Sequence, residues 1–394
     1  MTTHSGSTPA ARYAELLAEA NQIRGVSLWQ DAWRRLKRNR VAILSLLFLI
    51  TVTFVAFITP LLPLQSPILQ DLKHRQFQAP NVRPVTLGVL KFEAELDDLR
   101  SRLATASAAD REALQKQVLQ KQDAGPLKTL WYKPGPLTRR MIEARLSLFG
   151  DWCVPSICGT DNLGRDILAR IFWGARVSLT VGVVAALVSL LIGVSYGATA
   201  GYLGGWVDEA MMGLVNVLYS IPFIFVVIFL ITILSEDSIK KKLETYHVNQ
   251  IMIFYLVIGA IYWLTMSRVV RGQVISLKNE QFIDAARTVG AGRARIIFRH
   301  LIPNVMGIVI VYLTLTIPAV MLFEAFLSFL GLGVSPPDVS WGLLVNEGLQ
   351  VITPVKIYWW LVLFPGLTLT LTLFALNFLG DGLRDALDPR MKNK

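Results

Sequence analysis

Few residues of this chain have the types and spacing that catalysis requires. The G-x-x-x-x-G-K-[ST] sequence that cradles nucleotide phosphates does not occur. The four histidines, His4, His74, His247 and His300, are scattered, and no Cys/His spacing typical of a metal site is present. No Ser/His/Asp set, Cys/His set or pair of carboxylates accompanies an apolar pocket pattern. We therefore expect a non-catalytic chain that binds no metal and no cofactor of its own.

The two cysteines are the one pair of side chains with redox chemistry. Cys153 and Cys158 lie five positions apart with Pro155 between them, which could bring their α-carbons within disulfide distance. A bridge is allowed if the segment lies outside the cell membrane, in an oxidising compartment. Since connectivity is not readable from a sequence, a disulfide and two free thiols both remain open.

The segment FIDAARTVGAGRARIIFRHLIPN (Phe282–Asn304) has the types and spacing for docking. Its first half predicts a short helix whose small and apolar side chains share one face: Phe282, Ala285, Ala286 and Val289. Gly290 and Gly292 permit a left-handed turn, a second helix follows over Arg293–Leu301, and Pro303 suits the first turn of the next helix. Such a helix could insert into a groove of another protein or lie on anionic lipid. The residues alone leave these two alternatives level.

The elements that position this segment are predicted to be membrane-spanning helices. The chain is 53% hydrophobic and only 17% charged, against about 25% charged in soluble domains. An all-α integral membrane protein with six transmembrane helices is therefore expected, and the net charge of +11 is attributed to basic residues beside the spans and not to nucleic acid. The six runs long enough to cross a bilayer are Val41–Leu62, Ser178–Tyr202, Met211–Leu234, Gln250–Met266, Asn304–Leu327 and Tyr358–Phe378.

Basic residues predict the orientation of these spans. Residues 1–40 contain seven Lys/Arg, residues 268–303 seven more, and the tail after Phe378 four. The positive-inside rule places all three regions, and so both termini, in the cytoplasm. The expected organisation is a cytoplasmic segment at 1–40, a first transmembrane helix at 41–62, an external loop at 63–177, a core of five helices at 178–380 with a cytoplasmic loop at 268–303, and a cytoplasmic tail at 381–394.

The external loop carries two further helical patterns. Leucine and valine recur at helical spacing in Val89–Gln122, which predicts a helical hairpin standing outside the membrane. It could dock a partner or serve as a solvated accessory, and its many charges favour the second. Gly159–Arg176 predicts an amphipathic helix lying on the outer surface before the second span.

The docking segment resembles the cytoplasmic coupling loop of ABC-importer permease subunits, which has the pattern EAA…G…LP. Asp284 stands where that family usually has Glu, which keeps the charge and shortens the side chain by one methylene. The resemblance implies that the loop docks into a cleft on an ATP-binding subunit and transmits its movements. The coupling residues it implies are Phe282, Asp284, Ala285, Ala286, Gly290, Ile302 and Pro303.

Three other stretches are similar to dipeptide and oligopeptide permeases of the C-subunit type: GTDNLGRDILARIFWGARVSLTVG (Gly159–Gly182), FEAFLSFLGLGVSPPDVSWG (Phe323–Gly342) and LGDGLRDALDPR (Leu379–Arg390). The resemblance covers residues 30–62 and 159–392. It implies the fold of a type I ABC-importer permease, with the Val89–Gln122 hairpin as an external insertion between the first and second transmembrane helices.

For function, the resemblance implies half of the translocation pore of an ATP-driven importer for peptides or similar small solutes. The implied partners in the bacterial inner membrane are a homologous permease subunit, two ATP-binding subunits that hold ATP and magnesium, and an extracytoplasmic solute-binding protein. The motifs leave the solute open among dipeptides, oligopeptides, nickel and others.

Two polar residues within the predicted spans are candidates for pore lining or gating, Asn216 and Glu324. For Glu324 the alternative is that it satisfies backbone N–H groups near Gly331 and Gly333, or reaches the interface. The related permeases often have Arg and Asp where this chain has Gly213 and Asn216, and residues at these positions, three apart on a helix, would pair. If an ion pair had been removed as a unit, both charged residues would be absent, as they are here.

Two other functions compete with import. A secondary transporter or channel without ATPase partners predicts inverted repeats and charged sites at the midplane of the membrane; neither pattern is evident in the sequence. A membrane-anchored scaffold would act through the external hairpin, so that deleting it would abolish function.

Overall fold

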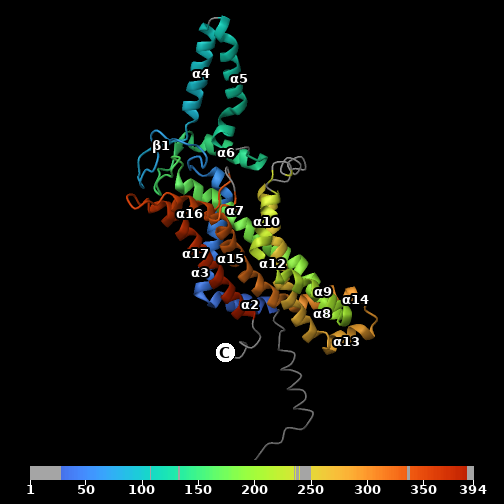
Figure 1. Cartoon of the computed structure of the whole chain (residues 1–394). Coiled ribbons are helices and arrows are strands. Elements are labelled where there is room, and N and C mark those ends of the chain that lie inside the picture. The colour runs from blue at the N-terminus through green and yellow to red at the C-terminus, as the bar shows by residue number, and fades with distance from the viewer. Residues whose placement is uncertain are drawn as a thin grey trace, which may run out of the picture.

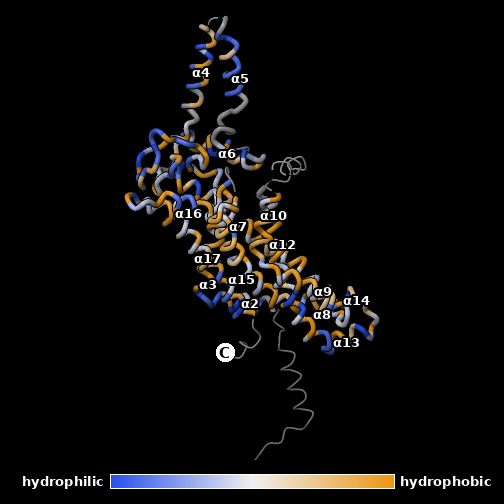
Figure 2. Tube along the Cα trace, viewed as in Figure 1, coloured by the Kyte–Doolittle hydropathy of each residue, from blue (hydrophilic) through white to orange (hydrophobic). Residues whose placement is uncertain are grey.

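The computed structural model describes residues 28–106, 108–131, 134–234, 236, 239, 250–334 and 338–387. Figure 1 shows a slanted bundle of long helices, with a helical hairpin projecting from one end and short helices at the opposite end. Hydrophobic residues dominate the bundle and hydrophilic residues the hairpin (Figure 2). This mostly helical architecture matches the expected fold class.

The first span is the helix α3 (Arg40–Ile58), continued by the short helix η1 (Thr59–Leu61). It begins where Asn39 caps it: the Asn39 side chain accepts a hydrogen bond from the backbone N–H of Ala42 at 3.2 Å. The resulting 22-residue span from Arg40 to Leu61 coincides with the predicted one. A short helix, α2 (Leu28–Arg38), precedes it.

The second span is longer than predicted and absorbs the expected surface helix. Helices α7 (Ile167–Val188), η2 (Ser189–Gly193) and α8 (Val194–Leu203) run without interruption over 37 residues. The prediction of a separate amphipathic helix over Gly159–Arg176 is wrong, because Asp166 caps α7 and nothing breaks the helix after it. At 1.5 Å per residue such a helix is about 55 Å long, so it extends beyond a hydrocarbon core of about 30 Å.

The third predicted span is two helices, α9 (Gly205–Ser220) and α10 (Phe223–Leu234). They are bent by 79° at the break that contains Pro222. Ile221 is extended, because the proline ring disfavours the helical conformation for the residue before it. The pair is therefore a broken span.

The remaining long helices follow the last three predicted spans but extend past them. They are α12 (Gln250–Leu277), α15 (Ile302–Phe329) and α17 (Trp360–Leu387). The short helices α14 (Arg293–Arg295) and η3 (Ile296–Leu301) join α15 in one 37-residue stretch, Arg293–Phe329. Among the described residues four helices qualify as spans by length and apolarity, and the bent pair makes a fifth; α12, 28 residues long, follows the predicted fourth span.

Outside the bundle, a small domain carries the predicted hairpin. Its helices are α4 (Val89–Thr105) and α5 (Ala108–Leu130), with α6 (Pro136–Phe149) at their base. Strand β1 (Val85–Thr86) pairs antiparallel with β2 (Trp152–Cys153) beneath the hairpin. Lys121 of α5 forms an ion pair with Glu95 of α4 at 2.7 Å. The last short helix, α16 (Trp341–Gln350), lies at this same end of the bundle (Figure 1).

The two cysteines are free thiols and do not form the disulfide that their spacing allowed. The physical reason is that they pack into different hydrophobic clusters. Cys153 lies with Leu87, Trp131 and Ile142, whereas Cys158 lies in a cluster built by α7, α16 and α17. Burial raises the pKa of Cys153 to about 11 and that of Cys158 to about 12, so both thiols are protonated and unreactive at neutral pH.

Candidate functional site

The predicted docking segment forms a short helix, α13 (Gln281–Thr288), at the end of the bundle opposite the hairpin (Figure 1). It lies between the end of α12 and the start of the Arg293–Phe329 helix. Ile283, a residue that the sequence analysis did not single out, is fully buried and anchors α13. It packs with Val274 of α12 and with Ile297 and Leu301 of η3. A signal was available in the sequence, because Ile283 is the one large apolar residue on the face opposite Ala285.

The outward face of α13 includes exposed apolar side chains, as docking requires. Phe282 and Ala285 are exposed, and Val289, just beyond the helix, is 89% exposed. Ala286 is half-buried and packs against the cluster that holds Ile283. The predicted face therefore divides: three of its four members point away from the bundle and one points toward it.

Asp284 occupies the first turn of α13, where a negative charge is favourable for the helix dipole. Arg287 holds its carboxylate at 2.9 Å. The same guanidinium donates to the backbone carbonyl of Lys278 at 3.3 Å and lies over the ring of Tyr202. Arg287 thereby connects α13 to the end of α8 and to the residue that follows α12, and Asp284 holds its guanidinium.

A tight turn at Gly290 ends α13. Gly290 has φ +85°, a left-handed conformation that residues with a Cβ resist. The backbone N–H of Ala291 donates to the carbonyl of Ala286 at 3.0 Å and closes the turn. Gly292 has φ −67°, so the expectation that both glycines serve a left-handed turn holds for Gly290 alone.

Ile302 and Pro303 are the first two residues of α15 and directly follow η3. The predicted second short helix over Arg293–Leu301 is not separate from this span. It continues into α15 through the π-helical turn η3. Sequence periodicity could not show this, because a π turn adds one residue without changing the composition.

Behind α13, a glycine seam joins α8 to α12. Gly197 and Gly201 sit one turn apart on α8, and Gly193 lies one turn before them. A Cβ on Gly201 would lie 2.9 Å from the carbonyl oxygen of Arg271, and one on Gly197 would overlap the carbonyl oxygen of Ser267. The two backbones are in direct contact, as small residues at helix interfaces in membranes permit.

A bidentate ion pair lies at the same end of the bundle as α13. The guanidinium of Arg271 on α12 donates to both carboxylate oxygens of Asp208 on α9, each at 2.6 Å. Lys278 donates to the carbonyl of Gly201 at 3.3 Å. These contacts connect helices α8, α9 and α12 to one another, and α13 follows α12 along the chain.

Asn216 lies on the exposed side of α9 and pairs across helices. Its side-chain oxygen accepts a hydrogen bond from Arg268 of α12 at 3.0 Å, and Arg268 also stacks on the ring of Tyr219 at 4.0 Å. Gly213 has open space around it. The hydrogen-bond partner of Asn216 is thus Arg268 of α12.

Glu324 is fully buried near the opposite end of α15. Its carboxylate accepts hydrogen bonds from Ser328 at 2.8 Å and Ser178 at 3.4 Å. The expected partners near Gly331 and Gly333 are replaced by these hydroxyls. Ser178 in turn accepts the backbone N–H of Trp341 at 3.1 Å, so the cluster joins α7, α15 and α16.

A second cluster fixes α16 to the start of α7. Arg170 and Arg165 of the α7 region bind Asp161 at 2.7 and 2.6 Å, and both also contact Glu347 of α16. The two positive and two negative charges balance. No group of three or more His, Cys, Asp or Glu side chains able to hold a metal occurs in the part of the chain that the structure describes.

Comparison with known families identifies two matching models. Residues 189–393 match the binding-protein-dependent transport system inner membrane component. Residues 27–80 match the N-terminal TM domain of oligopeptide transport permease C. The first match contains α13 and the helices α9 and α12, which the Asp208–Arg271 ion pair joins. The hairpin α4–α5 lies between the two matched regions.

Curated relatives align along nearly the whole chain. The dipeptide transport system permease protein of Bacillus subtilis (strain 168) is 36% identical over 376 residues, which is 95% of this chain and 90% of the relative. The oligopeptide transport system permease protein of Escherichia coli (strain K12) is 37% identical over 376 residues, 95% of this chain and 96% of the relative. A solved structure, described as inward-facing conformations of the MetNI methionine ABC transporter, aligns at TM-score 0.41 and 17% identity over 55% of this chain and 94% of that chain.

Proposed function

The chain belongs to the family of binding-protein-dependent transport system inner membrane components, and on this premise we propose that it forms half of the translocation pore of an ATP-driven peptide importer. Both well-covered relatives named above are peptide permeases, which supports peptides as the solute. The end that carries α13 is the cytoplasmic end, and the hairpin stands outside the membrane.

ATP hydrolysis takes place in two partner subunits that hold ATP and magnesium. The observation that carries this proposal is α13 itself, a short helix with an exposed small apolar face and a buried anchor. Movement of an ATP-binding subunit at Phe282 and Ala285 would pass through Ile283 into α12 and η3. From α12 it would reach α8 through the glycine seam and α9 through the Asp208–Arg271 pair.

A homologous permease subunit completes the pore. Large apolar side chains remain exposed along α9 and α10: Leu214, Val217, Phe225 and Phe229. In the assembled transporter this surface meets the second permease, lipid or the pathway, and Asn216 on α9 is the polar residue placed to line the pathway. Glu324 is enclosed by serine hydroxyls, so its contribution to gating is to hold α16 against α7 and α15. An extracytoplasmic solute-binding protein delivers the peptide at the outer end.

Affinity purification of the tagged chain in mild detergent tests this function. Recovery of two ATP-binding subunits and a second permease is expected. A matched preparation with the exposed face of α13 made polar, F282S/V289S, should retain the second permease and lose the ATP-binding subunits. Recovery of the wild-type chain alone, still active in uptake, would favour a secondary transporter.

A further inference from the structure

The helix α2 has an orientation fixed by packing against the end of α17. Ala32 and Leu36 are buried together with Ala386, and Leu383 packs against them. Gly382 of α17 lies close to Ala42, where a Cβ would overlap it. The opposite face of α2 is consequently held away from the bundle.

That outward face carries exposed positive charges. Arg34, Lys37, Arg38 and Arg40 are exposed within seven residues, and the described part of the chain provides no carboxylate within ion-pair distance of any of them. Arg35, by contrast, pairs with Asp31 at 2.6 Å.

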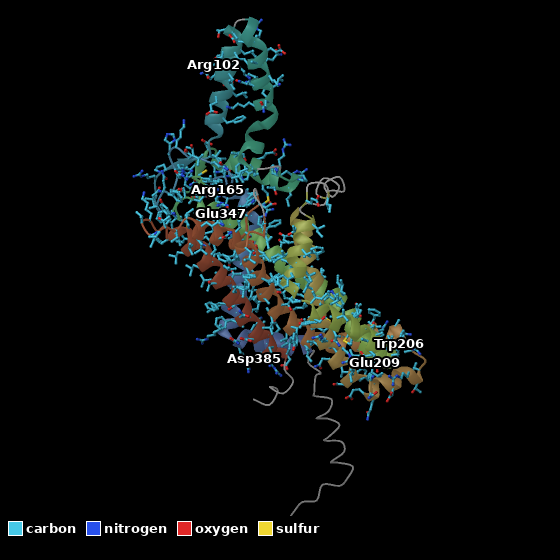
Figure 3. The ribbon with its side chains drawn as sticks, in the orientation of Figure 1. Arg102, Arg165, Trp206, Glu209, Glu347 and Asp385 are labelled. Carbon is cyan, nitrogen blue, oxygen red and sulfur yellow. The ribbon has the colours of Figure 1, made fainter. Side chains whose placement is uncertain are left out.

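Some exposed arginines elsewhere in the structure have acidic partners, whereas others, such as Arg140 and Arg293, form no ion pair within the described part of the chain. Arg100, Arg102 and Arg139 each pair with an aspartate or glutamate of their own helix. Asp385 of α17 lies at the same end of the bundle as α2 (Figure 3), and no ion pair joins it to α2 in the described part of the chain. Among the described residues, Arg34, Lys37 and Arg38 of α2 and Arg40 at the start of α3 therefore have no acidic partner and can bind an external anion.

The surroundings of this patch are those of a lipid-facing surface. The most apolar window of α3 is only 17% buried, less than that of any other candidate span, and its exposed side chains include Leu44, Leu47 and Phe54. Trp33 is 48% exposed beside the patch, with the Lys37 ammonium 5.4 Å from its ring centre. An exposed tryptophan at the end of a span is typical of the membrane interface.

Position distinguishes lipid from an ATP-binding subunit as the occupant. Figure 1 shows α2 beside α3 and α17, well separated along this end of the bundle from α13. The surface next to α2 is the exposed apolar side of α3, which suits the acyl chains of lipids.

We propose that α2 and the first turn of α3 bind the phosphate headgroups of anionic phospholipids through Arg34, Lys37, Arg38 and Arg40. Basic clusters directly beside a transmembrane helix attract anionic lipid, and each Lys or Arg adds to the attraction. The acyl chains lie along α3, and Trp33 sits at headgroup level.

Native mass spectrometry of the purified transporter, incubated with phosphatidylglycerol or phosphatidylcholine, tests the proposal. The wild type should retain phosphatidylglycerol at least tenfold better, and R34Q/K37Q/R38Q should reduce that preference to within about twofold. R34K/R38K keeps the charge and should keep the preference. R100Q/R102Q/R139Q removes three charges from the external domain and should leave the preference unchanged.

The charge-removed variant could insert in the wrong orientation, because the same residues orient the first span. The wild type alone provides a second measurement. Raising the salt from 0.1 to 1 M shortens the Debye length from about 10 to about 3 Å, so the preference for phosphatidylglycerol should fall severalfold. Salt-independent retention, an undiminished preference in R34Q/K37Q/R38Q, or loss of the ATP-binding subunits from that variant without loss of lipid would overturn the proposal.

Discussion

Single residues decide whether α13 is presented in the correct orientation. Gly290 and Gly292 both have open space around their α-carbons, so steric contact does not distinguish them. Backbone conformation does, because only Gly290 has a positive φ. Sequence spacing identified the segment but could not tell which glycine needs to be a glycine.

Substituting these two glycines separates the effect of backbone strain from the effect of side-chain size on uptake. G290V should strain the turn by about 1–2 kcal/mol and lower ATP-coupled uptake severalfold while membrane insertion stays normal. G292V, the matched control, should retain most of the uptake because its φ suits any residue. The measurement is uptake of labelled peptide by cells or proteoliposomes; equal uptake by both variants would remove Gly290 from the coupling role.

Asp166, which caps α7, is buried, and burial raises its pKa to about 6. Its amide contact with Ala169, its hydroxyl contact with Ser156 and the charge of Arg75 oppose the shift, and Asp161 adds to it. Because the folded pKa lies above the unfolded one, the folded chain binds the proton more tightly between about pH 4 and 6. Stability from this group is present at low pH and lost as pH rises through 6.

Acidification from pH 7.5 to 5 should therefore stabilise the purified protein by about 1 kcal/mol through this residue. D166N keeps a capping side chain and should remove that part of the pH dependence. The exposed Asp97 provides the control, since D97N should leave the wild-type pH dependence intact. Thermal unfolding in detergent at both pH values measures the effect, and an unchanged slope in D166N would refute it.

At the level of elements, the glycine seam brings the backbones of α8 and α12 into direct contact behind α13. Hydropathy predicted that both segments are helices but not that they touch, because contact between distant helices leaves no periodic pattern in either one. The same limit explains why the Asp208–Arg271 pair and the partner of Asn216 were not found. Runs of apolar residues, in contrast, predicted where the long helices lie, although the third predicted span is broken into α9 and α10 and several helices extend past their predicted ends.

Two identical substitutions test the seam. G197A places a methyl against the carbonyl oxygen of Ser267 and should destabilise the protein by about 1–3 kcal/mol, although alanine is the better helix former. G213A meets no atom within 4 Å and should be neutral or stabilising by up to about 1 kcal/mol. Thermal unfolding of both variants decides; a G197A protein as stable as G213A would show that the seam has room.

At the level of the whole molecule, the structure places α13 and the hairpin at opposite ends of the helix bundle. The docking segment and the basic residues predict from the sequence that the end with α13 is cytoplasmic. The domain that carries the hairpin was predicted only as a polar loop with a hairpin, because its folding depends on pairings such as β1 with β2 that join residues 66 and 68 positions apart. The bent span at Pro222 was marked by its proline, yet the angle depends on the neighbouring helices.

Removal of the hairpin tests whether the external end is essential. Replacing residues 89–130 by a short Gly/Ser linker should preserve uptake within about twofold, since the hairpin lies outside both family matches and its contacts are largely internal ion pairs. Uptake assays, with membrane abundance measured in parallel, provide the comparison. Abolished uptake at normal abundance would instead support a docking role for the hairpin.

Cross-linking from α13 tests the central claim most directly. Cysteine at Ala285, on the exposed face of α13, should form a cross-link of one permease to one ATP-binding subunit in the assembled transporter, and the yield should change when ATP is added. Cysteine at Leu119, exposed on the hairpin, is the control and should give none. If Ala285→Cys gives no cross-link to an ATP-binding subunit in a transporter that still imports peptide, α13 is not the coupling helix and the account is contradicted.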